Sequence, residues 1–336
     1  MRTGIKPQVV LVHGIGGPRE VEAERREWKT ALAEGARAAG HADAISGLTM
    51  DWSADTGFAH YADLFARKGA QGADAAGLDD EEVAELTLAV VSEVIEALLA
   101  SPQYASDAQL KRLLVQAQPT PVNPAGLPKV DEGIGALARR ASAVCTKLAR
   151  VPGVQPGLQR ISAAQSLGIL SQPGRYLRRK EFAPLPDGRS ASLDERIRAR
   201  VLEQLDVRRP AIVIAHSLGS VVALEALAGY EGRVALFVTV GSPIAMNALI
   251  WQRLRPNPPA VPRTVERWVD FWDSDDPVVP LRRLTELMAP NAAGVRPEPV
   301  PLASRRLWTH PATDYLRRGE VAAPVMETLA RLSAAS

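Results

Sequence analysis

Short apolar runs alternate with longer amphipathic stretches towards both ends of the chain. Runs typical of buried strands lie at residues 9–12, 211–215, 234–240 and 265–272, and residues 45–52 are a further strand candidate. Helical patterns lie between them, at residues 19–39 and at residues 218–228, where Gly229 is placed to end the helix. Short buried strands separated by helices predict an α/β fold with a doubly wound, mostly parallel sheet.

The middle of the chain follows a different pattern. Between residues 53 and 190 we find no strand signal, and helical periodicity takes its place. Residues 79–100 and 132–150 each carry apolar side chains three or four positions apart, which marks one buried stripe on each helix. We therefore expect a core formed by residues 1–53 and 190–336, interrupted by a helical insertion at residues 54–189.

Composition indicates an ordinary globular protein. The chain has 336 residues, of which 46% are hydrophobic and 23% charged, and its only cysteine, Cys145, has no partner for an internal disulfide. The N-terminal residues lack the features of a signal peptide, and no apolar run is long enough to cross a membrane. We expect a cytoplasmic protein without a transmembrane segment.

Charge is balanced overall but not locally. The net charge of +2 arises from 40 basic and 38 acidic residues, so the total gives no reason to expect binding to nucleic acid. The second half of the insertion nevertheless concentrates cations: Lys129, Arg139, Arg140, Lys147, Arg150, Arg160, Arg175, Arg178, Arg179 and Lys180. Two interpretations stay open, a solvated helical face and a docking surface for an anionic substrate or an acidic partner, such as an acyl carrier or a phospholipid headgroup.

The most specific local motif is Ala215-His216-Ser217-Leu218-Gly219, between a predicted strand and a predicted helix. A tight strand-to-helix turn with small flanking residues lifts a serine hydroxyl off the sheet, as in a nucleophile elbow. The start of the helix also adds positive potential where negative charge develops during acyl transfer. The motif predicts that Ser217 is a nucleophile.

A second motif, His13-Gly14-Ile15-Gly16-Gly17, follows the first predicted core strand. It has neither the glycine spacing of a dinucleotide-binding loop nor the lysine of a phosphate-binding loop. Backbone N–H groups at such a turn can bind the oxyanion of a tetrahedral intermediate. We predict Ile15 and Leu218 as the oxyanion-hole donors.

Together these two motifs resemble the α/β-hydrolase family, and in particular bacterial lipases whose elbow also begins with alanine. The resemblance covers the N-terminal strand and helix and the chain after about residue 190. In this family, the region over the carboxyl edge of the sheet forms a cap that shapes the substrate pocket. The resemblance therefore implies that the insertion acts as a cap or lid.

Family chain order places an acid and then a histidine after the nucleophile. Only His310 lies beyond the last predicted strand, so it is the expected base, which takes the Ser217 proton and returns it to the leaving group. For the acid we favour Asp276, because Asp276-Pro277-Val278-Val279 resembles the family pattern of an acid followed by x-x-V, and Asp273 is the second candidate. We expect the ring of His216 to point away from this site if the elbow is formed.

These residues predict a serine hydrolase that cleaves an ester or thioester of a small-molecule or acyl substrate through an acyl-enzyme, with no cofactor. An acyltransferase or cyclase would use the same triad, and a catalytically reduced interaction module is a second alternative. Dehalogenases and epoxide hydrolases of this fold need a carboxylate nucleophile, which argues against them here. No two histidines have the i, i+4 spacing of a helical zinc site, so we expect no metal.

Overall fold

The computed structural model divides the chain into two compact units. The first comprises Met1–Gly14, Pro18–Ala62 and Glu195–Ser336, and the second comprises Ile15–Gly17 and Asp63–Asp194. The structure describes residues 6–16, 20–46, 53–66, 81–100, 102–118, 134–148, 150–151, 171–246, 250–273, 276, 278–279, 284–303 and 310–334.

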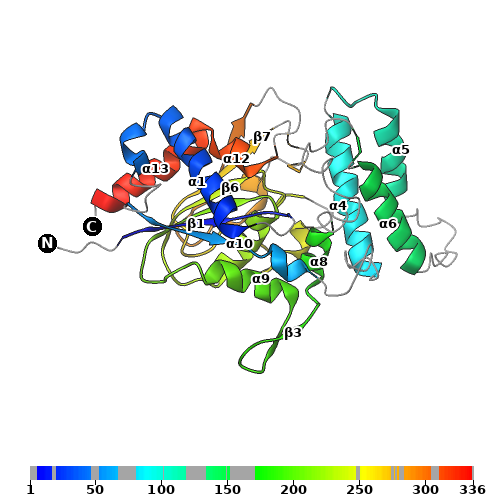
Figure 1. Cartoon of the computed structure of the whole chain (residues 1–336), viewed down its shortest axis with the longest axis horizontal. Helices are drawn as coiled ribbons and strands as arrows, with labels where there is room; N and C mark the ends of the chain where they lie inside the picture. The colour runs from blue at the N-terminus through cyan, green and yellow to red at the C-terminus, as the bar shows by residue number, and fades with distance from the viewer. Residues whose placement is uncertain are drawn as a thin grey trace. The chain divides into compact units, whose positions relative to one another are not determined.

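A parallel sheet forms the centre of the first unit (Figure 1). Its six strands run in the order β2-β1-β5-β6-β7-β8, and each neighbouring pair is parallel. The strands are β1 (Gln8–Val12), β2 (Asp55–Ala59), β5 (Ala211–His216), β6 (Val234–Val240), β7 (Trp268–Asp273) and β8 (Pro297–Leu302). The central strands β5 and β6 are buried along their whole length, because helices cover both faces of a parallel sheet.

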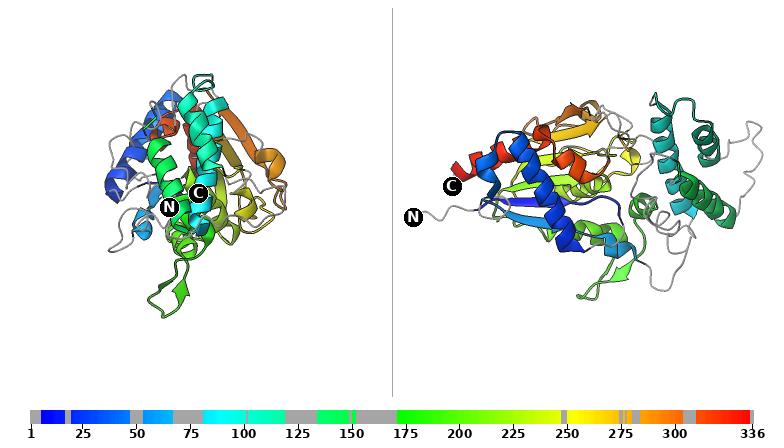
Figure 2. Two further views of the ribbon diagram at one scale, coloured as in Figure 1. Left: turned by 90° about the vertical axis from the view of Figure 1, so that its right-hand side faces the viewer. Right: turned by 45° about the horizontal axis from the view of Figure 1, so that its top comes forward.

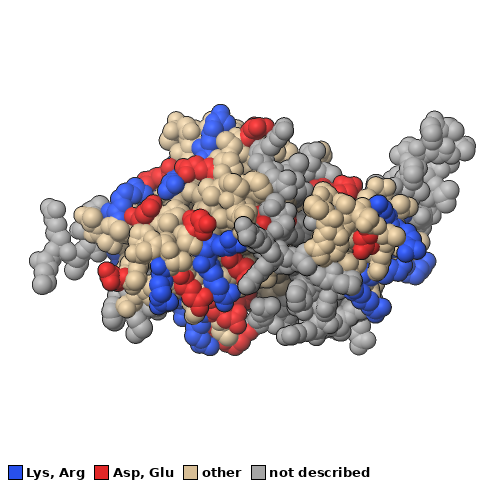
Figure 3. Space-filling model, turned by 90° about the horizontal axis from the view of Figure 1, so that it is seen from above, with Lys and Arg blue, Asp and Glu red and all other residues tan. Residues whose placement is uncertain are grey.

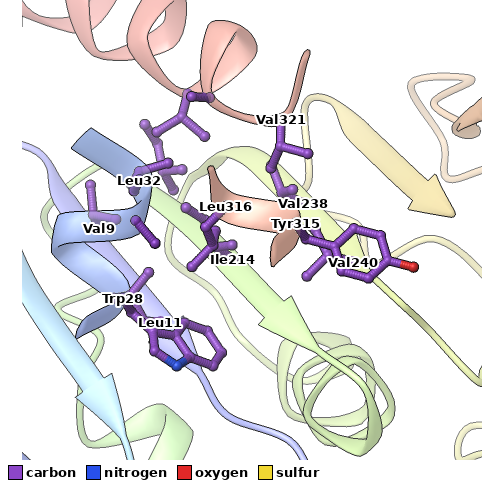
Figure 4. Packing of buried hydrophobic residues seen from close by; sticks show 14 of the residues in the cluster. Val9, Leu11, Trp28, Leu32, Ile214, Val238, Val240, Tyr315, Leu316 and Val321 are labelled. Carbon is purple, nitrogen blue, oxygen red and sulfur yellow. The ribbon is translucent and has the colours of Figure 1, made fainter. Parts of the chain in front are cut away.

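Alternate residues of the strands point to opposite faces of the sheet, and this divides the core. Figure 4 shows apolar side chains of β1, β5 and β6 packed beneath Trp28 and Leu32 of α1 (Val21–Ala38). Beside α1, α12 (Ala312–Leu316) and α13 (Gly319–Ala334) cover the same face. The strand residues between these point to the opposite face of the sheet. There, α10 (Leu218–Ala228) packs on β5 and β1. The predicted doubly wound α/β fold is confirmed.

The second unit is mainly helical and has its own core. It contains α4 (Glu81–Ala100), α5 (Ala108–Ala117), α6 (Ile134–Leu148) and α8 (Gln172–Arg178), and a ribbon of β3 (Ala183–Pro184) and β4 (Ser190–Ala191). Figure 2 shows α4, α5 and α6 side by side, in line with their mutual contacts. The predicted stripe on α4, from Val83 to Leu98, is buried. These helices therefore cover one another's apolar stripes.

The remaining helical elements are short. The 3₁₀ helices are η1 (Ala42–Ala44), η2 (Ala62–Phe65) and η4 (Trp251–Arg253), and the short helices α9 (Leu193–Leu202) and α11 (Leu284–Leu287) precede β5 and β8. In the part of the chain that the structure describes, no helix is both long and apolar enough to cross a membrane.

The strand predictions differ from the structure at both edges of the sheet. Ile45 continues helical backbone after η1, and residues 47–52 lie outside the described residues. The strand lies instead at β2, inside the segment where we found no strand signal, and among the described strands β2 pairs only with β1. At the other edge we missed β8, whose sequence Pro-Glu-Pro-Val-Pro-Leu carries prolines that an edge strand tolerates.

Candidate active site

Ser217 lies in a sharp turn between β5 and α10. Its φ of 53° and ψ of −133° are unusual for a residue with a side chain, and such strain is typical of a nucleophile elbow. Glycines make the turn possible, because a Cβ on Gly14 would lie 2.6 Å from the Ser217 Cβ and a Cβ on Gly219 would lie 2.2 Å from the His13 carbonyl oxygen. The end of β1 and the start of α10 therefore approach each other closely.

A chain of hydrogen bonds joins Ser217, His310 and Asp276. The Ser217 Oγ is 2.9 Å from His310 Nε2, and His310 Nδ1 is 2.9 Å and 3.1 Å from the two carboxylate oxygens of Asp276. Ser217 follows β5, Asp276 follows β7 and His310 precedes α12, and all three side chains are buried. The structure thus brings together three residues that are widely separated in the sequence.

Asp276 is surrounded by groups that favour its ionised form. Burial alone would raise the pKa of this carboxyl. The electrostatic interaction with His310 and the hydrogen bonds donated by His310, the Tyr315 hydroxyl and the Val278 N–H outweigh burial, so the pKa is lowered. The Tyr315 O–H donates to Oδ2 at 2.8 Å, and the Val278 N–H donates to Oδ1 at 3.0 Å. Burial and the adjacent carboxylate raise the pKa of Tyr315 well above its usual value, so its hydroxyl remains a donor. Asp276 is therefore a carboxylate at neutral pH.

Gly241 leaves room for Asp276 and His310 to meet. Its φ of 56° is in the left-handed region, and a Cβ there would lie 2.8 Å from Asp276 Oδ2 and 3.3 Å from His310 Nδ1. A side chain at this position would strain the backbone and displace the hydrogen bond between Asp276 and His310.

The second candidate acid, Asp273, has different neighbours. It ends β7, is 2% exposed and has Arg318 Nη2 at 3.9 Å from its Oδ2. Its backbone carbonyl accepts a hydrogen bond from the Asp276 N–H. The hydrogen bonds of His310 Nδ1 go to Asp276, and Asp275 lies outside the described residues.

Hydrogen bonds within each unit fix parts of the predicted oxyanion turn. In the first unit, the Tyr61 N–H donates to His13 Nε2 at 3.0 Å and the Tyr61 hydroxyl donates to the His13 carbonyl at 2.6 Å. In the second unit, Gly16 makes two hydrogen bonds with the side-chain amide of Gln172, one from its N–H and one to its carbonyl. The Gly16 N–H is thus already used, and Ile15 and Leu218 stay our predicted donors.

Sequence reasoning missed two residues of this network. Tyr315 carries no pattern that distinguishes it from a core tyrosine of α12. The expectation that His216 points away was wrong, because its Nε2 lies 2.6 Å from the backbone carbonyl oxygen of His310. The motif places His216 next to Ser217 in the sequence, but it does not show that the segment carrying His310 packs against His216.

Several of the clustered cations are neutralised within the second unit. Arg175 is 1% exposed and pairs with Glu181, Arg179 pairs with Asp194, and Lys180 pairs with Glu82. Lys129 and Arg160 lie outside the described residues. Figure 3 shows patches of Lys and Arg side chains on one face of the molecule. Of the clustered cations, Arg139, Arg140 and Lys147 belong to α6. The predicted basic surface is therefore smaller than the sequence indicated.

The comparison with protein families identifies the class. The model of the alpha/beta hydrolase family matches residues 134–333, and this chain belongs to that family. Neither the curated proteins nor the solved structures gave a match to the chain. The match begins where α6 begins, so it includes part of the helical unit as well as β5 to α13. Among the described residues, no group of three or more His, Cys, Asp or Glu side chains is arranged to hold a metal ion.

Proposed function

We propose that this protein is a serine hydrolase that cleaves a carboxylic ester or thioester through an acyl-enzyme. The observation that carries the proposal is the hydrogen-bond chain from Ser217 through His310 to Asp276. Nucleophile, base and acid follow one another in the order typical of this family. The strained backbone of Ser217 supports the same role.

In the first half of the reaction, Ser217 Oγ attacks the substrate carbonyl carbon while His310 Nε2 takes the hydroxyl proton. The tetrahedral intermediate then expels the alcohol or thiol, which receives that proton from His310 and leaves Ser217 acylated. In the second half, His310 takes a proton from water, whose oxygen attacks the acyl carbon, and returns the proton to Ser217 Oγ as the acid leaves. Asp276 stabilises the imidazolium of His310 in both halves.

Negative charge on the substrate oxygen needs donors that are in place before the reaction. We assign this role to the backbone N–H groups of Ile15 and Leu218. Leu218 is the first residue of α10, where the helix dipole adds positive potential. Since the Gly16 N–H is bound to Gln172, Ile15 is the donor we assign from the glycine-rich turn.

Acyl transfer or cyclisation remains the alternative within the same chemistry, because either differs only in which nucleophile enters after acylation. Added alcohols, amines or thiols should compete with water if the protein is a transferase. An interaction module without activity is disfavoured by the complete set of hydrogen-bonded groups.

The decisive experiment is labelling with a fluorophosphonate, followed by a screen of p-nitrophenyl esters and acyl thioesters of different chain lengths. Ser217→Ala should abolish labelling and lower kcat by roughly 10⁴-fold or more, because the nucleophile is removed. Ser333→Ala, an exposed serine of α13, is the matched control and should behave as wild type. Normal turnover by folded Ser217→Ala protein would refute the proposed function.

A further inference from the structure

The residue before the nucleophile makes a direct contact with the segment that carries the base. His216 is the last residue of β5, and its Nε2 lies 2.6 Å from the backbone carbonyl oxygen of His310. The ring centroids of the two histidines are 4.7 Å apart, with 41° between their planes. His216 is buried, and its ring and the Trp28 ring meet at an angle of 80°, with their centroids 6.0 Å apart. This contact joins two segments that are 94 positions apart in the sequence.

The acceptor determines which nitrogen of His216 carries the proton. A carbonyl oxygen only accepts hydrogen bonds, so Nε2 must be protonated to donate. Burial, with a further contribution from His310, lowers the pKa of His216 to about 3, so its ring is neutral in the working range of an enzyme. A neutral ring protonated at Nε2 has no proton on Nδ1.

We infer that His216 is a positioning residue, whose Nε2–H holds the backbone of His310 against the end of β5. The inference rests on the proposed function, because it assigns His310 the role of base. Since Ser217 is the next residue along the same strand end, the contact fixes the base and the nucleophile to one rigid element.

The proton transfers explain why a backbone contact is useful here. The bond from His310 Nε2 to Ser217 changes character each time the proton moves, and the bond from Nδ1 to Asp276 strengthens when the ring is charged. The hydrogen bond from His216 to the His310 carbonyl involves neither ring nitrogen of the base. It persists through the whole cycle, and because the donor ring is neutral, it adds no positive charge beside the developing imidazolium.

The glycine-rich turn supports the same arrangement independently. A Cβ on Gly14 would lie 3.1 Å from His216 Nδ1 and 3.0 Å from the His216 carbonyl oxygen. Gly14 therefore leaves space for this ring as well as for Ser217.

Three substitutions separate donation from packing. In His216→Gln, the amide nitrogen stands the same number of bonds from Cα as Nε2, whereas in His216→Asn it stands one bond closer, and His216→Phe keeps an aromatic ring without a donor. We expect His216→Gln to retain kcat within about 3-fold, and His216→Asn and His216→Phe to lose roughly 10- to 100-fold in kcat with little change in KM. The rate of fluorophosphonate labelling should fall in parallel, while near-UV circular dichroism stays native.

A second measurement on the unmodified protein does not depend on turnover. ¹⁵N NMR of histidine-labelled protein should show His216 as a neutral ring protonated at Nε2, unchanged between about pH 5 and pH 9. A charged ring, the Nδ1-protonated tautomer, or wild-type kcat in His216→Phe would overturn the inference. If Ser217→Ala kept its activity, the proposed function would fail instead, while the NMR result on His216 would stand. If His216→Phe does not fold, the comparison of kcat between His216→Gln and His216→Asn, together with the NMR spectrum, still tests the positioning role of His216.

Discussion

At the scale of single residues, the two buried aspartates after β7 give a sharp comparison. Asp276 and Asp273 are equally buried, at 2% exposed each, but only Asp276 shares hydrogen bonds with His310 Nδ1. Asp276→Asn should lower kcat by roughly 10³- to 10⁴-fold, because the carboxylate that sets the tautomer of His310 and stabilises its charge is lost. Asp273→Asn serves as the matched control and should stay within about 10-fold of wild type. The opposite ranking in steady-state kinetics would make Asp273 the acid.

Tyr315 leads to a prediction about pH. Its hydroxyl is one of the donors that lower the pKa of Asp276, so Tyr315→Phe should raise that pKa. A more basic carboxylate stabilises the protonated, inactive form of the site, so the acid limb of the profile of kcat/KM against pH should move to higher pH. Tyr104→Phe, a buried tyrosine of the second unit, should leave the profile unchanged. An unmoved acid limb in Tyr315→Phe would show that this donor does not tune the acid.

The sequence allowed the predicted site residues to be chosen because each stands in a local pattern. Ser217 has small neighbours between a strand and a helix, and His310 is the only histidine late in the chain. The contacts of Tyr315 and His216 have no such pattern, because they depend on how distant loops meet. The sequence therefore predicts the types and the order of the proposed site residues. The contacts that orient them, made by Tyr315 and His216, can be identified only from the three-dimensional structure.

At the scale of secondary structure elements, β7 carries a buried carboxyl outside the proposed triad. Asp270 accepts a hydrogen bond of 2.6 Å from Thr239 of β6, and the Trp268 indole N–H donates to the same hydroxyl at 3.0 Å. Burial raises the pKa of Asp270 from 3.8 to about 6, against the opposing effect of Thr239. The charged form is therefore unfavourable in the folded protein.

This carboxyl should make stability depend on pH. Below about pH 4 it is protonated in both states, but between about pH 4 and pH 6 the unfolded chain releases its proton first, so the free energy of unfolding falls as pH rises. Asp270→Asn removes this titration. Relative to wild type, the variant should gain on the order of 1–3 kcal/mol between pH 4 and pH 7 in urea unfolding. The exposed substitution Asp43→Asn is the control, and a difference between Asp270→Asn and wild type that does not vary with pH would contradict the prediction.

Central elements were easier to predict than edges for a physical reason. The strand β6 was predicted with its exact bounds, because a strand buried on both faces is a continuous apolar run. The edge strand β2, with the sequence Asp-Thr-Gly-Phe-Ala, is not buried along its whole length, and β8 is rich in proline. Edge strands have fewer neighbours to bury them, so their sequences carry a weaker signal.

At the scale of the whole molecule, the role of the helical unit stays a prediction. Its apolar stripes are covered within the unit, which leaves its cation-bearing face as the testable feature. If that face docks an anionic partner, Arg139, Arg140, Lys147 and Arg150 all changed to glutamine should lower activity on a carrier-bound or anionic substrate by about 10-fold and remove its salt dependence. Activity on a small neutral ester should hardly change. Equal effects on both substrates, measured from low to high salt, would show that the cation-bearing face is only a solvated surface and does not dock a partner.

The separation of the proposed catalytic groups along the chain has a consequence for how activity is regained after denaturation. Ser217 and His310 are 93 positions apart, Asp276 lies 34 before His310, and all neighbouring strands of the sheet are parallel, so each pairing closes a long loop. Such high contact order slows folding, because chain entropy is lost before distant contacts form. On dilution from denaturant, helical circular dichroism should therefore recover before turnover does. Enzyme activity becomes a stringent kinetic reporter of the last tertiary contacts to assemble.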